Sequence, residues 1–290
     1  MKTPTSLLPA ALWIAATLAL PTGAQTINNG QFVGGIFQMD ITIPAGPPWI
    51  LQSSPVLPAG TWTTLGSYSG FNAGVIDPST GTASQRYYRL IRIPVPVVGT
   101  DCGLNPYGFI RKAQPPGFCM QANPLVADAG NSLNNLLPVM PDQTEFYQYS
   151  PASGWTLDTW DSIWPGWGFG PLLNPGQGCF IKNPLSTTIT LEFIGTVQQG
   201  VLTVPVATSY NMISSKVPQA GLITTDLLMT PPDQTALYKF VCGFGYQIYV
   251  YDLSGVGGWC PTEPFIDVAE SFWVQPPSPF TWTRIFNTCP

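Results

Sequence analysis

The sequence predicts a mainly β protein, with a small N-terminal β-sandwich-like domain followed by two tandem copies of a β-rich module of about 90 residues. Three observations predict this class: short β-prone stretches between turns, an abundance of Pro (32) and Gly (29), and an internal repeat. Apolar residues make up 44 % of the chain, with 10 Trp, 11 Tyr and 15 Phe. Because disordered chains are poor in such residues, the Pro and Gly are interpreted as turns between strands.

Residues 1–24 are predicted to be a signal peptide for export. Lys2 provides a positive charge, an uncharged apolar run covers residues 7–20, and Thr22-Gly23-Ala24 offers small residues for cleavage. The run of about 14 residues is short for a membrane-spanning helix, which needs roughly 20. An uncleaved membrane anchor is the alternative. We expect a mature chain without a membrane span, secreted or held at the cell surface.

The N-terminal β domain is predicted to cover residues 25–95. Residues 37–43 alternate apolar and polar side chains, as a half-buried strand does. Further strands are expected around residues 49–52, 61–65 and 86–93. Residues 94–99 contain Pro94 and Pro96 and are expected to be stiff, and a linker is predicted over residues 96–107.

The two module copies are predicted at residues 108–198 and 199–290. The tetrapeptide Pro-Asp-Gln-Thr occurs at residues 141–144 and again 91 residues later at 232–235. Other residues match at spacings of 91 or 92, namely Phe118/Tyr210, Met120/Met212, Leu136/Leu227, Tyr147/Tyr238, Trp155/Tyr246, Trp160/Tyr251, Asp161/Asp252, Trp167/Trp259 and Phe180/Phe272. Residues 189–194 and 246–251 are β-prone and predict strands, while residues 132–137 and 222–229 favour short helices ended by proline.

Several motifs are similar to those of known secreted modules. Four of them follow one another in the N-terminal region: Leu51-Gln52-Ser53-Ser54, Trp62-Thr63-Thr64-Leu65, Asp77-Pro78 and Arg86-Tyr87-Tyr88-Arg89-Leu90. The region resembles a small β module of large secreted proteins from planctomycete- and verrucomicrobium-like bacteria. Residues 117–125 and 175–180 resemble a partner module from the same kind of protein. The resemblance implies an extracellular or surface setting and provides no catalytic residue.

Composition excludes several classes of function. Charged residues are 9 % of the chain, the formal net charge is −5, and no stripe of Lys and Arg suits a nucleic acid. Weak charge favours association with other copies of the chain or with surface and matrix polymers such as polysaccharide. The chain has no histidine, which excludes Ser-His-Asp and Cys-His catalysis and His-ligated metal sites. No metal and no cofactor is predicted.

Six cysteines in an exported chain favour disulfides over a metal site or a redox pair. Fifteen pairings are possible for six cysteines. Cys119 and Cys179 occupy positions where the second copy has Asn211 and Ser271, so their bond would be absent from that copy. The pairs suggested by the repeat are Cys119–Cys179, Cys242–Cys260 and Cys102–Cys289.

Asp158 and Asp161 are the candidate catalytic residues if the protein is an enzyme. They lie among tryptophans, and a glycosidase needs two carboxyl groups about 5–10 Å apart beside aromatic side chains that stack on sugar. Asp161 has a counterpart in Asp252, which favours a turn role in both copies.

Trp164 is the candidate ligand-binding residue. Trp155, Trp160 and Trp167 have aromatic counterparts in the second copy and are therefore expected in cores, whereas Trp164 aligns with Gly255. An exposed Trp stacks on sugar rings without needing charge.

The sequence favours a non-catalytic extracellular structural or surface protein that self-assembles or adheres. A carbohydrate-binding protein that uses exposed Trp and Tyr is the alternative, and a carboxylate-dependent glycoside hydrolase is third. Assembly predicts open strand edges or apolar patches, glycan binding predicts aromatic side chains on an exposed face, and hydrolysis predicts two converging carboxyl groups.

Overall fold

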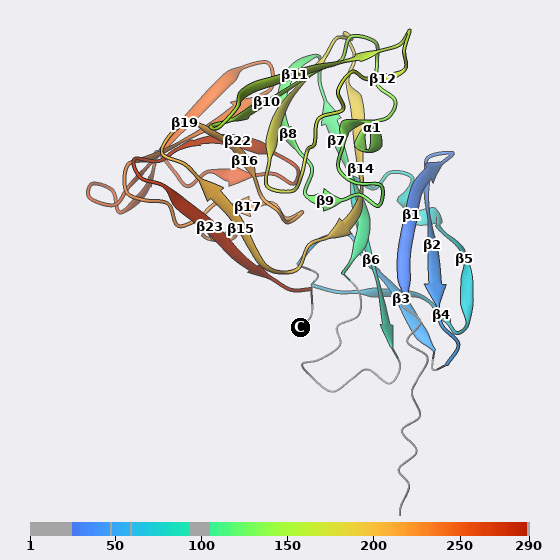
Figure 1. The fold of residues 1–290 in the computed structure, drawn as a ribbon. Helices are drawn as coiled ribbons and strands as arrows, with labels where there is room; N and C mark the ends of the chain where they lie inside the picture. Colours follow the sequence, from blue (N-terminus) through green and yellow to red (C-terminus); the bar gives the residue numbers. More distant parts are fainter. Residues whose placement is uncertain (1–24, 47, 59, 93–104, 289–290) are drawn as a thin grey trace, which may run out of the picture.

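The computed structural model describes residues 25–46, 48–58, 60–92 and 105–288 (Figure 1). The predicted signal peptide, most of the predicted linker, and both Cys102 and Cys289 lie outside the described residues. The described residues are mainly β, as predicted, with a single four-residue helix, α1 (Leu133–Leu136), among them. None of their helices is long and apolar enough to cross a membrane.

The N-terminal region forms a sandwich of two antiparallel sheets. The strands of this region are β1 (Thr26–Val33), β2 (Ile36–Ile43), β3 (Trp49–Ser54), β4 (Thr63–Tyr68), β5 (Phe71–Asp77) and β6 (Gln85–Arg92), with a 3-10 turn η1 (Pro78–Thr80). Strand β2 buries every second residue, because alternate side chains of a strand point to opposite faces. Its buried face packs in one core with Leu51, Tyr88 and Leu90 from the facing sheet.

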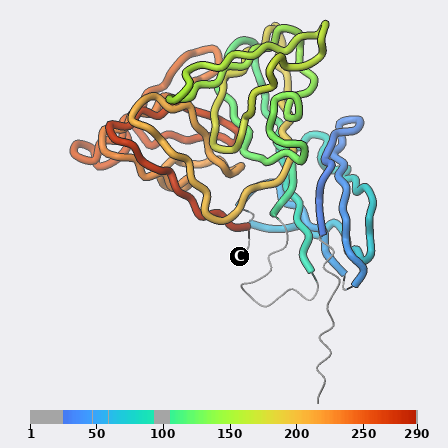
Figure 2. Tube along the Cα trace, in the orientation of Figure 1, coloured from blue at the N-terminus to red at the C-terminus, as the bar shows by residue number. Residues whose placement is uncertain are grey.

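The sandwich is continuous with the next part of the chain, so its sheet does not end at the predicted linker. One sheet has the order β4-β3-β6-β7-β14-β9, in which β7 (Tyr107–Gln114), β9 (Leu125–Val126) and β14 (Ile189–Val197) follow the predicted boundary. Strand β6 pairs with β7, with Tyr88 opposite Tyr107. Phe109 from β7 lies in the N-terminal core. Figure 2 shows this junction at the centre of the molecule.

Two five-stranded antiparallel sheets and two two-stranded sheets form the rest of the described molecule. The first sheet has the order β8-β13-β10-β11-β12, with β8 (Gly117–Ala122), β10 (Glu145–Ser150), β11 (Gly154–Asp161), β12 (Gly166–Trp167) and β13 (Gly178–Asn183). The second sheet has the order β16-β22-β18-β19-β20, with β16 (Asn211–Ser214), β18 (Thr235–Val241), β19 (Gly245–Asp252), β20 (Gly258–Cys260) and β22 (Ser271–Gln275). Further strands of this half are β15 (Gly200–Val206), β17 (Gly221–Leu222), β21 (Phe265–Ile266) and β23 (Phe280–Phe286).

The strand orders of the two sheets correspond, edge strand to edge strand. The Pro-Asp-Gln-Thr turns before β10 and β18 also match: Gln143 and Gln234 both have a φ of 62°, and each following threonine hydroxyl donates to its proline carbonyl at 2.7 Å. The predicted helix at residues 132–137 is confirmed by α1. That at residues 222–229 is wrong, because Asp226 accepts the Leu222 amide and Leu228 adopts a left-handed φ of 59°, which gives turns.

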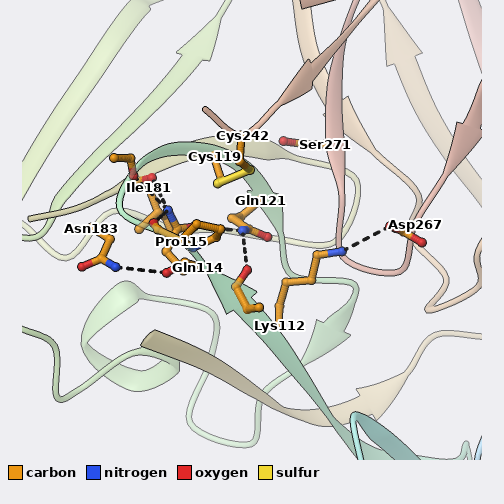
Figure 3. Close-up of a disulfide and its surroundings, with 12 residues drawn as sticks. Lys112, Gln114, Pro115, Cys119, Gln121, Ile181, Asn183, Cys242, Asp267 and Ser271 are labelled. Carbon is orange, nitrogen blue, oxygen red and sulfur yellow. Dashed lines mark hydrogen bonds and ion pairs between the residues drawn. A yellow bond between two sulfur atoms is a disulfide. The ribbon is translucent and has the colours of Figure 1, made fainter. Parts of the chain in front are cut away.

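The two sheets are linked by a disulfide between Cys119 of β8 and Cys242 in the turn after β18 (Figure 3). The predicted pairs Cys119–Cys179 and Cys242–Cys260 are therefore wrong. Cys119 lies opposite Ile181 and Cys179 opposite Gln121, a diagonal of about 7–8 Å between Cα atoms that exceeds the reach of a disulfide. Cys260 lies opposite Val250 at the far end of β19 from the Cys242 turn.

Further bonds hold the halves together beside this disulfide. The Ala122 amide donates to the Ala269 carbonyl at 3.0 Å, and the Ser271 hydroxyl donates to the Cys179 carbonyl at 3.3 Å. Lys112 and Asp267 form an ion pair at 3.9 Å, as Figure 3 shows. A Cβ atom on Gly178 would lie 2.6 Å from Ser271 and 2.9 Å from Met212, so the close approach of the sheets requires glycine there.

Replacing both Cys119 and Cys242 with Ser is expected to lower the free energy of unfolding by about 4 kcal/mol. The bond closes a loop with a sequence separation of 123, and long loops lose most entropy in the unfolded chain when they are cross-linked. Urea denaturation of the variant and the parent measures the difference. A linked Cys119–Cys242 peptide after non-reducing digestion is the direct check, and a Cys119–Cys179 peptide would contradict it.

The thiols of Cys179 and Cys260 are expected to react at very different rates. Cys260 is exposed, whereas Cys179 is fully buried and burial raises the pKa of its thiol, so little thiolate is available. Iodoacetamide labelling of the native protein, followed by peptide mapping, should modify Cys260 and leave Cys179 unmodified until denaturant is added. Rapid native labelling of Cys179 would contradict its placement in the core.

Candidate functional site

Asp158, the first predicted catalytic residue, is buried and fully bonded to backbone. It accepts the amides of Thr159 at 2.8 Å, Gly168 at 3.0 Å, Phe169 at 3.0 Å and Gly170 at 2.9 Å. Four amide donors satisfy a carboxylate in place of water. Asp158 therefore fixes the loop after β12 and faces the core side of its sheet, opposite Phe146.

Asp161, the second predicted catalytic residue, closes the turn between β11 and β12. It accepts the Ile163 amide at 2.7 Å and the Trp164 amide at 3.4 Å. Its counterpart Asp252 accepts the Gly255 amide at 2.8 Å, a bond that, with others, lowers the pKa of that carboxyl. The turn role shared by both residues is what their equivalence in sequence predicts.

Trp164 projects from that turn with 81 % of its surface exposed, beside Ile163, which is as exposed. Trp160 and Trp167 are buried, as predicted. The prediction for Trp155 is wrong: 56 % of this side chain is exposed, because it lies on the face of the first sheet that points away from its own core.

That face of the first sheet is turned toward an equivalent face of the second. On β10 and β11, Tyr147 pairs with Leu157 and Tyr149 with Trp155, while on β18 and β19 Tyr238 pairs with Ile248 and Phe240 with Tyr246. Directly opposed residues of paired strands point to the same side. The first face consists of Phe118, Met120, Tyr147, Tyr149, Trp155, Leu157 and Phe180, and the second of Tyr210, Met212, Tyr238, Phe240, Tyr246, Ile248 and Trp273.

The centre of the contact between the faces is a buried cluster of Met120, Phe180, Met212 and Trp273. Two aromatic pairs cross it in matching fashion: Tyr149 lies 5.3 Å from Trp273, and Phe240 lies 5.2 Å from Phe180, between ring centroids. The first pair is tilted and the second is edge-on, and such aromatic pairs stabilise beyond their burial. Away from this centre the faces diverge and leave their aromatic side chains half exposed.

Each diverging part holds an open pocket. The Phe-rich pocket, of about 550 Å³, is lined by Phe118, Tyr147, Trp155, Leu157, Phe180 and Phe240. The Tyr-rich pocket, of about 500 Å³, is lined by Tyr149, Trp155, Tyr210, Tyr238, Tyr246, Ile248 and Trp273. Both volumes are within the usual range for small-ligand sites. Each residue of the Phe-rich lining has an equivalent in the Tyr-rich lining, and Trp155 lines both pockets. From the opposite sheet, Phe240 lines the Phe-rich pocket, and Tyr149 and Trp155 line the Tyr-rich pocket.

The equivalence of the two linings corrects one of the residue matches that the sequence repeat predicts, that of Phe180 with Phe272. Phe180 lies opposite Met120 and Tyr147, and Trp273 lies opposite Met212 and Tyr238, so Phe180 corresponds to Trp273 rather than to Phe272. Phe272 is in the core of its own half, as Cys179 is in the other. A slip of one residue exchanges the two faces of a strand, which is why the match in sequence placed Phe272 wrongly.

The pockets differ in their polar groups. In the Phe-rich pocket the single hydroxyl, that of Tyr147, donates to Glu145, and this bond raises the pKa of Tyr147 to about 12. Glu145 is also bonded to Lys182 at 2.7 Å, which lowers the pKa of its carboxyl. The Tyr-rich pocket contains four tyrosine hydroxyls; Trp273 donates its indole N–H to Tyr246 at 3.2 Å, and Tyr238 donates to Gln275 at 3.2 Å.

Comparison with known proteins finds no match, either among protein-family models or among curated proteins. The resemblance to modules of planctomycete- and verrucomicrobium-like bacteria stays a resemblance.

Sequence reasoning missed the pockets although the signal was present. Tyr147 and Tyr149 in β10, and Tyr238 and Phe240 in β18, are aromatic at every second position. Phe146 and Leu237, which directly precede these pairs and point to the other face, are apolar and fully buried, whereas Gln148 and Lys239 lie between the aromatic residues. A strand with apolar side chains on both faces is covered on both sides or has one face available to a ligand.

Asp158→Asn is expected to lower the free energy of unfolding by about 2 kcal/mol or more, because an amide replaces one accepting oxygen and turns a donor toward backbone N–H groups. Asp161→Asn, in an exposed turn, should cost less than about 1 kcal/mol. Urea denaturation of both variants tests the difference. Equal stability of the Asp158 variant and the parent would argue against the structural role.

Proposed function

We propose that this chain is a non-catalytic extracellular carbohydrate-binding protein whose Tyr-rich pocket holds a sugar. The single observation that supports this most is the pocket's composition: four tyrosines and two tryptophans at a junction between two sheets, of which Trp155, Tyr210 and Tyr246 are about half exposed. Sugar rings present apolar C–H faces, which stack on aromatic side chains, and hydroxyl edges, which need hydrogen-bond partners. Tyrosine satisfies both requirements.

Charge further supports a neutral ligand. No Lys, Arg, Asp or Glu lines the Tyr-rich pocket. Burial raises the pKa values of Tyr238 and Tyr246, so their hydroxyl groups stay neutral at ordinary pH. A neutral polysaccharide needs no counter-charge and would avoid the desolvation cost of an ion.

The carboxylate glycosidase receives no support from the predicted acid pair. A general acid must hold a proton and reach the glycosidic oxygen, and the Asp158 carboxylate accepts four backbone amides on the core side of the sheet. Asp161 accepts backbone amides in its own turn. Both residues are engaged in building the loop that displays Trp164.

A self-assembling or adhesive surface protein is the second candidate, and one observation favours it. Ile163, Trp164 and Phe169 are each at least four-fifths exposed, the first two on the turn between β11 and β12 that Asp161 closes, and Phe169 on the loop after β12 that Asp158 bonds. Exposed apolar groups fixed by buried bonds suit contact with another surface. We also infer the tandem duplication, from residues 108–198 and 199–290, as the origin of the equivalent sheets.

Tyr210→Ala is expected to weaken retention on the insoluble polysaccharides that the parent binds by about tenfold, since one aromatic stack contributes on the order of 1 kcal/mol. Phe118→Ala, at the equivalent position of the Phe-rich pocket, is the matched control and should bind as the parent does. Pull-down on a panel of neutral polysaccharides measures retention. Unchanged retention of Tyr210→Ala, or a parent that binds nothing in the panel, would contradict the proposal.

Trp164→Ala separates the two candidates. Binding at the Tyr-rich pocket predicts unchanged retention of this variant, because Trp164 lies on the β11–β12 turn and is not part of that pocket. Loss of retention would instead place the binding surface at the exposed turn. Size-exclusion chromatography of the same variant tests assembly: a concentration-dependent oligomer of the parent that is lost in Trp164→Ala would favour the second candidate.

A further inference from the structure

The Phe-rich pocket is a second site, and we propose that it binds an uncharged apolar small molecule. The inference does not depend on the sugar-binding role of the Tyr-rich pocket. It rests on the lining residues that differ between two pockets built from equivalent strands.

Polarity differs between the pockets while shape and aromatic character are retained. Phe118 stands where the Tyr-rich pocket has Tyr210, and Phe240 stands where it has Tyr149. A third exchange is Phe180 for Trp273, which removes an indole N–H donor. All three exchanges remove a hydrogen-bonding group and keep an aromatic ring.

The one hydroxyl group of the Phe-rich lining is satisfied within the protein. The Tyr147 hydroxyl donates to Glu145, and Lys182 donates to the other oxygen of the same carboxylate at 2.7 Å. The carboxylate and the ammonium neutralise each other. Apart from the Trp155 indole N–H, which lines both pockets, the lining offers a ligand hydroxyl no free donor. A polar ligand would therefore lose bonds to water there, whereas an apolar ligand has none to lose.

The removal of apolar surface from water also favours an apolar ligand in the Phe-rich pocket. Phe118, Trp155 and Leu157 are each two-fifths or more exposed, so they hold apolar surface against solvent around a space of about 550 Å³. Filling the space with an apolar molecule removes both surfaces from water. Because no ionised group is left uncompensated in the lining, charge gives no advantage to an ionic ligand.

Titration with N-phenyl-1-naphthylamine, an uncharged probe whose fluorescence rises in apolar surroundings, tests the proposal. The parent should show a single saturable enhancement. Leu157→Asp places a carboxylate in the Phe-rich pocket and should weaken probe binding by at least about tenfold. Its matched control is Ile248→Asp, at the equivalent position of the Tyr-rich pocket, which should leave probe binding within about twofold of the parent.

Phe118→Ser and Tyr210→Ser form a second pair for the case that either aspartate variant unfolds, and circular dichroism checks the fold of all four. No saturable enhancement with the parent would overturn the proposal. So would equal weakening by the two members of a pair, or full binding by both Phe-rich variants. Polysaccharide retention is read on the same proteins, so that a failure of the sugar-binding role is seen separately from a failure of this site.

Discussion

The structure depends on strands that are apolar on both faces. In β10, Phe146 faces the core of its own half while Tyr147 and Tyr149 face the second sheet, and β18 repeats the arrangement with Leu237, Tyr238 and Phe240. Such strands require a partner sheet, and each sheet is the partner of the other. The contact buries Met120, Phe180, Met212 and Trp273, and the twist of sheets separates the outer strands from one another. The pockets are the part of the two-sided apolar pattern that the contact leaves uncovered, while the Cys119–Cys242 bond and the glycine at position 178 hold the faces at a fixed approach.

The few acidic side chains of this chain are largely used to shape loops. Asp158 and Asp161 fix the hairpin β11–β12, and Asp142 and Asp233 accept the amides of Ser162 and Leu253 at 2.8 and 2.7 Å in corresponding turns. Asp77 accepts the Tyr88 hydroxyl at 3.0 Å and begins η1. With charged residues at 9 % of the chain, this use explains why a cluster of tryptophans and acids in the sequence does not become a catalytic cleft. The residues whose order in the sequence suggests a glycosidase support loops in the folded protein.

Much of the fold was predictable from the sequence, because it follows from local patterns. Alternation in residues 37–43 and β-branched or aromatic runs located strands correctly, and the turn chemistry of Pro-Asp-Gln-Thr was identified from its recurrence. Contacts between distant strands were not predictable in this way. The pairing of β6 with β7 joins a region that composition separates with a proline-containing stretch, and the partner of Cys119 is determined by how two sheets face each other. Comparing the copies also assumed that shared aromatic residues belong to cores. Trp155 and Tyr246 hold equivalent positions and are half exposed, because the two equivalent sheets share an exposed face as well as a buried one.

Where the linings of the two pockets differ, the Phe-rich pocket is the less polar. Positions at the centre of the contact keep their character, with Met120 and Met212 buried in equivalent places, and Tyr147 and Tyr238 are identical at the floor of each pocket. Around them the rings stay and the hydroxyl groups differ: Phe118 against Tyr210, and Phe240 against Tyr149. Packing alone would accept phenylalanine or tyrosine at a half-exposed position, where the hydroxyl reaches water at little cost. The fold therefore does not require the Phe-rich pocket to lack the polar groups that the Tyr-rich pocket has. That difference is what is expected when one architecture provides two sites that select ligands by polarity rather than by shape.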